Sequence, residues 1–407
     1  MVRFQLRASL VLALFLLSAA RFGQCRKTCV VKPGGNVHHD DAPAIIEAFD
    51  ECTHRGRVVF LSTKYHVNSV MQIGRLEDVH IDVYGELLWS TDIEYWLQNS
   101  LEVGYQNQST AFMIGGNRVR INGYGRGTFN GNGDAWYEFI DKQENKSNFP
   151  RRPHALTLNG LTNSVVKGMR FIRSQMWTLS MIYCRNVDLE DIFINNTGNV
   201  VGSLYNGDDC ISLKGNSTDI GIYDSECYDG SGIALGSIGQ FREQFETMER
   251  LTVKNVHFGN TLHAVYFKTW TDDQNGYPPN GGGGGLGYCS DMVFSNLTVS
   301  SIRNAAVAIS QCTQFTGAPG SGSCTDSRFQ IRDVAFRGIT GTTMSTRAAS
   351  LQCSAIAPCT DLGIFDVNLT LSSGTAADEY LCGNVKNNVG FNCTGKPCEE
   401  PSGSGEC

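Results

Sequence analysis

Short segments in which apolar and polar residues alternate recur along most of the chain. They are rich in Val, Ile and Phe and end near Asn, Gly, Asp or Thr, a pattern typical of β-strands. Their starts recur every few tens of residues, as in repeat architectures. The segments occupy 79–84, 118–123, 164–172, 186–194, 218–227, 250–258, 291–299, 329–336 and 362–371.

Many short strands fit either a sandwich of antiparallel hairpins or a parallel solenoid. Hairpins favour two-residue Asn-Gly or Asp-Gly turns between adjacent strands. Here, further apolar, glycine-rich pieces such as Ile211–Leu213 and Ile233–Leu235 separate the segments. Several short strands per repeat build the coils of a right-handed parallel β-helix. The pattern therefore favours an all-β parallel β-helix in which residues 21–407 form one domain.

The ends of a solenoid need caps because the terminal coils lack a neighbour. Within residues 41–52, the apolar positions Ala44, Ile45, Ala48 and Phe49 predict a short helix that closes the N-terminal end. We expect the cysteine-rich C-terminal tail to close the other end.

Residues 1–20 have the order of a secretory signal peptide. Arg3 and Arg7 precede a continuous apolar run from Ala8 to Leu17, and small residues lead to an expected cleavage after Ala20. The run is too short to span a bilayer, and no later stretch reaches the required length. We therefore expect a secreted, extracellular protein that does not contact a membrane.

Cysteines and glycosylation sequons fit the secretory route. The chain has 15 cysteines, and close pairs such as Cys353 and Cys359 predict disulfides. An odd count leaves at least one thiol unpaired, and Cys184 is our candidate because it lies in an apolar run. Seven N-x-S/T sequons make the chain an expected glycoprotein, at Asn107, Asn145, Asn195, Asn216, Asn296, Asn368 and Asn392.

Charge narrows the choice of partners. A net charge of −7 argues against a nucleic-acid surface. It does not exclude a polyanionic substrate, because a few local cations dominate at short range. The eight histidines form no ligand cluster, so we expect no metal and no cofactor. We expect a monomer.

The densest group of candidate chemical residues lies between 195 and 270. Asp208 and Asp209 follow Gly207 and precede an apolar strand. Side chains alternate in a strand, so adjacent aspartates share a site only where the backbone bends, and glycine permits such a bend. An isolated Asp-Asp pair is usually a solvated turn. Nearby residues favour a site, with Lys214 and Lys268 as cations and Trp270 as a sugar-stacking face.

The order of motifs in this region resembles glycoside hydrolase family 28, the polygalacturonases and their relatives. The family motifs N-T-D, G/Q-D-D, G-H-G and R-I-K are matched in that order over roughly residues 30–395. The matches are Asn196-Thr197-Gly198, Gly207-Asp208-Asp209, Ser231-Gly232 and Tyr266-Phe267-Lys268. The resemblance implies a right-handed parallel β-helix and a disulfide between Cys210 and Cys227.

The resemblance also implies roles for the site residues. Asp208 is then the general acid and Asp209 the general base of inverting glycoside hydrolysis, in which acid and base act on opposite faces of the sugar. The neighbouring carboxylate should raise the pKa of the acid. Lys268 matches the family lysine that contacts a galacturonate carboxylate, and Tyr266 and Ser231 are further substrate-binding candidates.

The sequence departs from the family pattern at three positions. Gly198 replaces the third aspartate of the family, so one carboxylate fewer orients the water. Ser231 stands at the histidine position and lacks a titrating ring. Tyr266 stands at the arginine position, so a bidentate carboxylate clamp is missing. These departures resemble the divergent fungal exo-acting branch, and the loss of a cation also suits a neutral neighbour such as rhamnose.

The leading hypothesis is an exo-acting galacturonidase that releases terminal galacturonic acid from acidic pectic chains. Alternatives are a rhamnogalacturonan hydrolase, exo or endo, and a pectin-binding β-helix without catalysis. Exo action requires a cleft blocked at one end. The segments 134–153 and 271–287 are long enough to block it.

Overall fold

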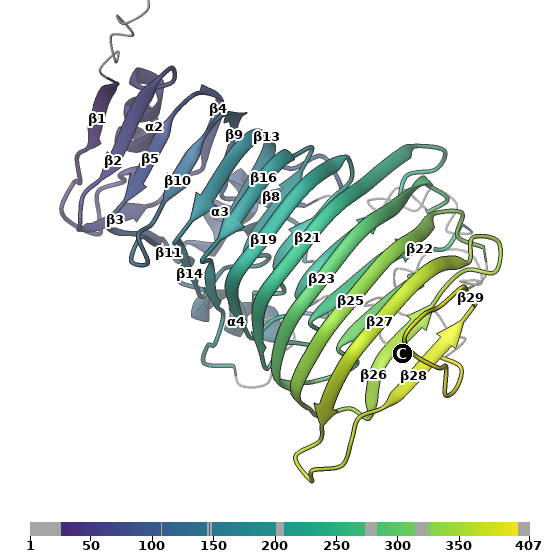
Figure 1. Ribbon diagram of the computed structural model, residues 1–407. Coiled ribbons are helices and arrows are strands. Elements are labelled where there is room, and N and C mark those ends of the chain that lie inside the picture. Colours follow the sequence, from purple (N-terminus) through teal and green to yellow (C-terminus); the bar gives the residue numbers. More distant parts are fainter. Residues whose placement is uncertain are drawn as a thin grey trace, which may run out of the picture.

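The computed structural model describes residues 26–397, except 107, 145, 147–148, 201–206, 273–282, 314–323 and 325. The expected signal peptide and the last cysteines of the tail lie outside these residues. The described chain winds into stacked coils whose strands pair in parallel with those of the next coil (Figure 1). The prediction of an all-β, right-handed parallel β-helix is confirmed.

Three runs of parallel strands follow the long axis. One run, which carries the candidate residues, contains β4 (Met71–Glu77), β9 (Phe112–Asn117), the start of β13 (Leu156–Lys167), β15 (Leu179–Ile182), β18 (Asp209–Leu213), β20 (Gly232–Ile238), β22 (Val265–Trp270), β24 (Val307–Thr313), β26 (Arg347–Gln352) and β28 (Glu379–Gly383).

A second run contains β1 (Lys27–Val31), β2 (Gly56–Phe60), β5 (His80–Val83), β10 (Arg120–Asn122), the end of β13, β16 (Arg185–Glu190), β19 (Ser217–Tyr228), β21 (Phe245–Gly259), β23 (Leu286–Ile302), β25 (Gln330–Thr343), β27 (Cys359–Thr370) and β29 (Val385–Lys386). The third contains β3 (Lys64–Val67), β6 (Glu86–Trp89), β11 (Thr128–Asn130), β14 (Arg170–Ile172) and β17 (Phe193–Asn195), and continues in the ends of the long strands.

Apolar residues at equivalent positions of successive coils form the core. Because the strands pair in register, each inward side chain stacks on the one from the neighbouring coil. One such buried column runs through Val187, Ile220, Leu251, Met292, Val334 and Leu362. The period-two pattern of the sequence is the cause of this packing, since a one-residue slip would expose every member of a column.

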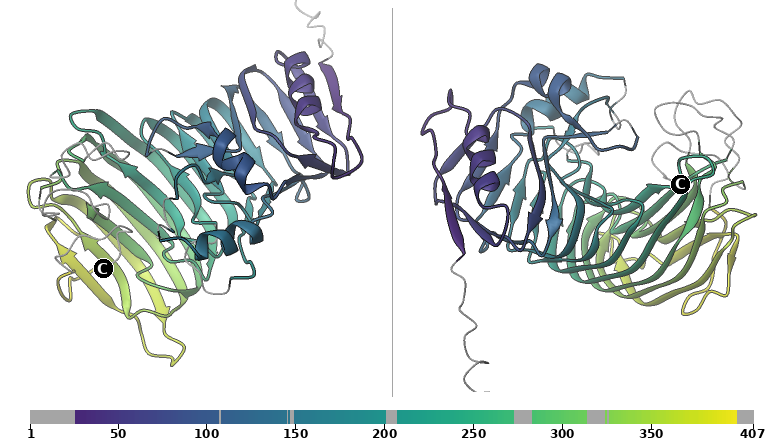
Figure 2. Two further views of the ribbon diagram at one scale, coloured as in Figure 1. Left: turned by 180° about the vertical axis from the view of Figure 1, so that it is seen from behind. Right: turned by 90° about the horizontal axis from the view of Figure 1, so that it is seen from above.

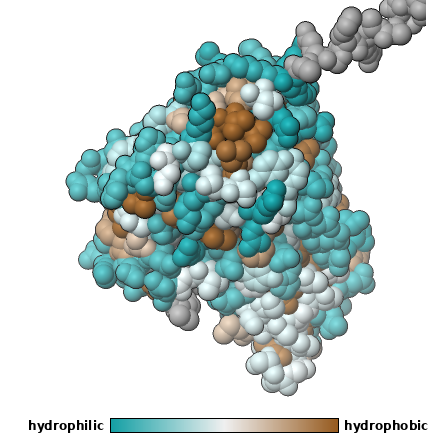
Figure 3. Space-filling view, turned by 90° about the vertical axis from the view of Figure 1, so that its left-hand side faces the viewer, coloured by the Kyte–Doolittle hydropathy of each residue, from teal (hydrophilic) through white to brown (hydrophobic). Residues whose placement is uncertain are grey.

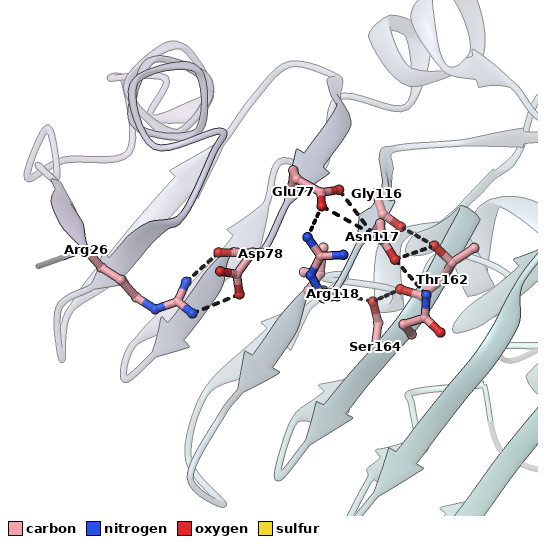
Figure 4. Close-up of polar contacts among 10 residues, drawn as sticks. Arg26, Glu77, Asp78, Gly116, Asn117, Arg118, Thr162 and Ser164 are labelled. Atoms are coloured by element: carbon pink, nitrogen blue, oxygen red, sulfur yellow. Dashed lines mark hydrogen bonds and ion pairs between the residues drawn. The ribbon is translucent and has the colours of Figure 1, made fainter. Parts of the chain in front are cut away.

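Polar side chains link the corners of neighbouring coils. Asn117 donates to Glu77 Oε2 at 3.2 Å, and Thr162 Oγ1 donates to Asn117 Oδ1 at 3.0 Å (Figure 4). Asn186 continues the ladder to Asn163 Oδ1 at 2.9 Å. These contacts satisfy polar groups that the turns would otherwise leave unpaired.

The predicted N-terminal cap is α2 (Ala42–Glu51). Its face of Ala42, Ile45, Ala48 and Phe49 is buried in the core of the first coils, while Glu47 on the opposite face is exposed. Seen from that side, the molecule is largely hydrophilic with scattered hydrophobic patches (Figure 3). The helix therefore covers apolar coil surface that has no further coil to pack against.

Two short helices that the sequence pattern did not predict lie outside the coils (Figure 2). They are α3 (Ile93–Asn99) and α4 (Asp134–Asp141). A small separate sheet follows α3, in which β8 (Ser109–Thr110) pairs antiparallel with β7 (Leu101–Glu102) and parallel with β12 (Pro153–His154). These insertions matter because they stand beside the candidate residues.

Five disulfides occur among the described residues. Cys210 is bonded to Cys227 and Cys353 to Cys359, with Cα–Cα distances of 6.3 and 5.7 Å. The other bonds are Cys29–Cys52, Cys312–Cys324 and Cys382–Cys393. Cys184 is a buried free thiol, as predicted, and Cys289 is a second one.

Four of the predicted glycosylation sites are exposed on the coils and the tail: Asn216, Asn296, Asn368 and Asn392. Asn195 is half-buried, and Asn107 and Asn145 lie outside the described residues. In the described part of the chain, we find no helix with the length and apolar character needed to cross a membrane.

Candidate active site

The two adjacent aspartates stand where the chain enters β18. Gly207 has a φ of 65°, and a Cβ at this position would lie 2.1 Å from the Asn196 side chain. Only glycine fits there, so the expected backbone bend is present. Asp208 follows with a φ of 42°. The pairing of β18 with β20 is irregular just after Asp209, which breaks the strict alternation of side chains and lets both carboxyls lie in one pocket.

Neighbouring coils hold the backbone of both aspartates. The Ser231 N–H donates to the Asp208 carbonyl at 2.7 Å, and the Thr178 N–H donates to the Asp209 carbonyl at 3.0 Å. The acids are therefore fixed by the solenoid and not by a mobile loop. Such rigid support is what a catalytic constellation requires.

The pocket gathers residues from five segments of the chain. Its lining consists of Gln106, Trp177, Asp208, Asp209, Gly236, Ser237, Tyr266 and Lys268. Four of the seven catalytic or substrate-binding candidates thus meet in one place. Lys214 lies beneath the lining, where its Nζ donates to the Gly236 carbonyl. Ser231 contributes the backbone contact described above.

Asp209 is held by two hydroxyl groups. The Tyr266 hydroxyl donates to its Oδ1, and Ser212 Oγ donates to its Oδ2 at 2.8 Å. Asp209 is 2 % exposed. Both oxygens of this buried carboxyl therefore accept hydrogen bonds, which fixes its orientation in the pocket.

Asp208 has the opposite character. Burial, the neighbouring charge of Asp209 and a hydrogen bond with that carboxyl raise its pKa to about 7, against the opposing effect of Arg152 and Lys268. The proton is therefore retained by Asp208 through the mildly acidic range. One protonated and one ionised carboxyl in a common pocket form the pair that general acid–base hydrolysis needs.

Buried cations surround the acids. Arg152 is fully buried, and its Nε donates to the Gln175 carbonyl at 2.6 Å. Burial lowers its pKa to about 10. Burial also lowers the pKa of Lys214 to about 7, although the charge of Asp209 opposes this shift. These cations compensate part of the negative charge of the aspartates.

Trp177 supports the floor of the pocket. Its ring stacks on His154 with centroids 4.3 Å apart, and Lys214 Nζ lies 3.9 Å from its centroid. Burial keeps the pKa of His154 well below its usual value, so this imidazole is neutral. Tyr105 also stacks on Trp177, at 6.3 Å.

A wall closes one side of the pocket. The turn between β7 and β8 brings Tyr105 and Gln106 across the coils to the aspartates. A separate apolar cluster packs it in place: Val103, Tyr105, Met113, Met176, Trp177 and Ile182, with Phe241 against it. Because the wall belongs to an earlier coil than β18, it stands on the N-terminal side of the acids.

This wall was missed in the sequence. The segments 134–153 and 271–287 were named as long enough to block the cleft, whereas the described element that reaches the pocket is the turn after β7, with Gln106. Most of 271–287 lies outside the described residues. The available signal was the run Leu101–Tyr105 with Trp177, both apolar at positions outside the strand pattern, but their contact spans more than seventy residues.

The expectation that Trp270 offers a sugar-stacking face is wrong. This residue is 1 % exposed and does not line the pocket. Tyr266, Lys268 and Trp270 would share a face in a regular strand. The pairing of β22 with β24 is irregular between Lys268 and Trp270, which changes the direction of the last side chain. The tryptophan that lines the pocket is Trp177.

Gly198 does not leave an empty place where the family pattern has an aspartate. A Cβ at this position would lie 2.4 Å from the Tyr137 ring and 2.8 Å from Asp134 Oδ1. Both residues belong to α4. The helix therefore occupies the space of the missing carboxylate, and Asp134 itself pairs with Arg173 at 3.2 Å.

The described residues contain no group of three or more His, Cys, Asp or Glu side chains arranged to hold a metal ion. The chemistry that the described arrangement supports is acid–base chemistry by side chains.

Comparisons with known proteins show which family the chain resembles. The model of the family "Glycosyl hydrolases family 28" matches residues 71–201 and 200–393. An α-L-rhamnosidase of Aspergillus niger, rgxB, is 50% identical over 98% of this chain and 97% of its own length. An exopolygalacturonase of Cochliobolus carbonum is 28% identical over 91% of this chain and 87% of its own length.

Among solved structures, an endo-xylogalacturonan hydrolase from Aspergillus tubingensis superposes with a TM-score of 0.69. The pair is 22% identical, and the match covers 91% of this chain and 99% of that one. At 22% identity, this similarity supports a shared fold and nothing more specific.

Proposed function

The chain belongs to glycoside hydrolase family 28, and on that premise we propose that it is a secreted, exo-acting pectin hydrolase that releases terminal α-L-rhamnose from rhamnogalacturonan chains. The sequence alone favoured release of galacturonic acid. The 50% identical α-L-rhamnosidase and the character of the pocket together shift the preference to the neutral sugar.

The observation that carries the proposal is the hydrogen bond from Tyr266 to Asp209. The family pattern places an arginine at this position. Here the phenol of Tyr266 stands in place of that arginine, and its hydroxyl points at Asp209. The pocket therefore has one cation fewer to pair with a sugar carboxylate. A neutral terminal sugar is bound without that cation.

Lys268 fits the same proposal. Rhamnose in rhamnogalacturonan is followed by galacturonic acid, so the enzyme still meets a carboxylate one unit along the chain. Lys268 is partly exposed at the pocket and can bind it by a charge-assisted contact. The same lysine also favours a second candidate, in which the terminal sugar itself is galacturonic acid.

The wall at 101–110 supports exo action. A chain that continued past the aspartates on the N-terminal side would collide with Gln106, which lines the pocket next to Tyr105. An apolar cluster holds Tyr105 in place. Only a chain end then reaches the acids. An endo-acting enzyme needs a cleft that is open at both ends.

In the proposed reaction, Asp208 donates its proton to the glycosidic oxygen as the C–O bond breaks. Asp209 takes a proton from a water molecule as the water oxygen bonds to the anomeric carbon. The net change in the protein is one proton moved from Asp208 to Asp209. Exchange with water then returns Asp208 to its protonated form and Asp209 to its carboxylate form.

Secretion is part of the proposal. Five disulfides in the described residues, with Cys210–Cys227 beside the site, are expected of a protein that folds in an oxidising compartment.

Product analysis tests the proposal. Purified protein is incubated with rhamnogalacturonan oligosaccharides that end in rhamnose, with those that end in galacturonic acid, and with oligogalacturonides. We expect free rhamnose from the first set alone. Free galacturonic acid would favour the second candidate, shorter internal fragments an endo enzyme, and unchanged substrate a binding protein. Asp208→Asn serves as the inactive control.

A further inference from the structure

Gln106 is a pocket residue to which the family pattern assigns no role. It stands in the turn between β7 and β8, is 4 % exposed, and lines the pocket together with both aspartates. Its Oε1 is buried and has no hydrogen-bond partner in the described part of the chain. A buried acceptor without a partner costs free energy, so a polar atom placed there is expected to be used by a ligand.

The turn holds this side chain in a fixed position. The Gln108 N–H donates to the Tyr105 carbonyl at 2.9 Å, and the Val103 N–H donates to the Gln108 carbonyl at 3.1 Å. Gln106 has a φ of 50°, in the left-handed region. A non-glycine residue keeps such a conformation only where its surroundings determine it. Here the stack of Tyr105 on Trp177 supplies that constraint.

The chemistry of an amide selects its ligand. An amide oxygen accepts a hydrogen bond from a sugar hydroxyl but repels a carboxylate, and it carries no charge. The nearby cations Lys268 and Arg152 act on Asp208, and Lys214 acts on Asp209. Gln106 is thus a neutral polar group of the pocket, together with Ser237 and with Tyr266, whose hydroxyl already bonds Asp209.

We propose that Gln106 is a specificity-determining residue that accepts a hydrogen bond from one hydroxyl group of the terminal neutral sugar. This inference rests on the proposed function and deepens it, because it assigns a residue to recognition of the sugar itself. A site built to bind a hydroxyl rejects analogues that lack it, since the buried acceptor then stays unpaired.

The contact is tested by combining variants of Gln106 with substrates that lack single hydroxyl groups, as in a double-mutant cycle. The substrates are a rhamnose-terminated rhamnogalacturonan oligosaccharide and its versions in which the terminal rhamnose lacks the 2-, 3- or 4-hydroxyl. The enzymes are wild type and Gln106→Leu, with Gln98→Leu as the matched control. Gln98 is an exposed glutamine on α3 that does not line the pocket.

We expect Gln106→Leu to lower kcat/KM on the intact oligosaccharide about tenfold, as for one lost neutral hydrogen bond. With wild type, kcat/KM on one of the deoxy substrates should also be about tenfold lower than on the intact oligosaccharide. With Gln106→Leu, that deoxy substrate and the intact one should have equal kcat/KM, because the contact is already absent. Gln98→Leu should match wild type throughout. Equal losses from all three deoxy substrates in both enzymes would overturn the proposal.

A further variant separates charge from shape. Gln106→Glu keeps an acceptor oxygen at the same place, so it should retain more activity than Gln106→Leu on the rhamnose-terminated chain. Lower activity than Gln106→Leu would count against the acceptor role. Thermal unfolding of each variant shows whether the fold is intact.

Failure of the proposed function can be distinguished from failure of the proposal for Gln106. If wild type releases only galacturonic acid, the rhamnosidase assignment is wrong, and the same cycle with deoxy-galacturonate termini still decides whether Gln106 contacts a hydroxyl.

Discussion

The Tyr266 hydroxyl donates a hydrogen bond to Oδ1 of Asp209 across 57 positions of the sequence. The two residues stand on β22 and β18, two coils apart. The contact makes the surroundings of the two aspartates different, because the hydroxyl orients Asp209, whereas burial raises the pKa of Asp208. Under the proposed function, a residue that differs from the family pattern thus positions the base.

Tyr266→Phe tests this contact. The change removes one hydrogen bond to a charged group, worth about 1.5–3 kcal/mol, so we expect kcat to fall about 10- to 100-fold. Tyr288→Phe is the matched control, since the Tyr288 hydroxyl bonds Glu249 at 3.0 Å away from the pocket. Unchanged kcat in Tyr266→Phe would mean that Ser212 alone orients the base.

The pH dependence of the reaction follows from Asp208. Its pKa is raised to about 7, chiefly by burial and by the charge of Asp209. A general acid works in its protonated form, so kcat/KM should fall as pH rises through about 7, roughly tenfold per pH unit above it. Rates measured from pH 4 to 9, after checking that the enzyme survives each pH, give the position of the fall.

Titration of Lys214 has to be excluded as the cause of this fall, because burial lowers its pKa to about 7 as well. In Lys214→Met the fall near pH 7 should persist, as the acid is unchanged. A fall that vanishes in this variant, or that lies near pH 4 in wild type, contradicts the assignment of Asp208.

The raised pKa of Asp208 also predicts how Asp208→Asn affects the free energy of unfolding. The folded protein binds this proton more tightly than the unfolded chain, so the contribution of Asp208 is full below its unfolded value of 3.8 and is lost as pH rises through about 7. Asparagine cannot ionise. The variant should therefore match wild type near pH 3.5 and exceed it at pH 8 by on the order of 4 kcal/mol, because the pKa rises from 3.8 to about 7. Unfolding curves at both pH values measure the difference, and an equal gain at both would contradict the prediction.

Gly198→Asp should not convert the site to the family pattern. A Cβ there lies 2.4 Å from the Tyr137 ring, which is buried and donates its hydroxyl to the Ser174 carbonyl at 2.9 Å. Overpacking of this kind costs about 1–3 kcal/mol. We expect a lower Tm and no gain on oligogalacturonides. Gly74→Asp is the control, since nothing lies within 4 Å of a Cβ at that exposed strand position.

The sequence was sufficient for the coils because their determinants are local. Alternation at period two places Val187, Ile220 and Leu251 inward, and equal spacing then stacks them. The aspartate pair was predictable for the same reason, since Gly207 and the two acids are neighbours in the chain.

The rest of the site depends on contacts between distant segments. The stacking of Tyr105 on Trp177 joins two insertions, each without a repeat pattern. The orientation of Trp270 depends on a local irregularity of strand pairing, which no alternation rule anticipates. The partner of the Tyr266 hydroxyl could not be read from the sequence either, because it depends on which coils lie side by side.

The stereochemical course of the reaction is the last prediction. Asp208 and Asp209 line one pocket, and the charge of Asp209 helps to raise the pKa of Asp208, so the two carboxyls lie near each other. Inverting pairs usually lie roughly 6.5–9.5 Å apart to leave room for a water molecule. Adjacent residues reach the lower part of that range only if their side chains diverge, so inversion by this pair requires such a divergence when the sugar and water are bound.

Proton NMR of the first-formed product decides between the routes. An inverting enzyme releases the β anomer first from an α-linked sugar, and we expect this result. The α anomer appearing first would show a retaining route, in which one aspartate attacks the sugar. On either route, Asp208→Asn and Asp209→Asn should each lower kcat by about 10²-fold or more. The double variant should lose little beyond either single one, because the two groups act as a unit. A fully active Asp208→Asn enzyme would remove the basis of the acid–base assignment.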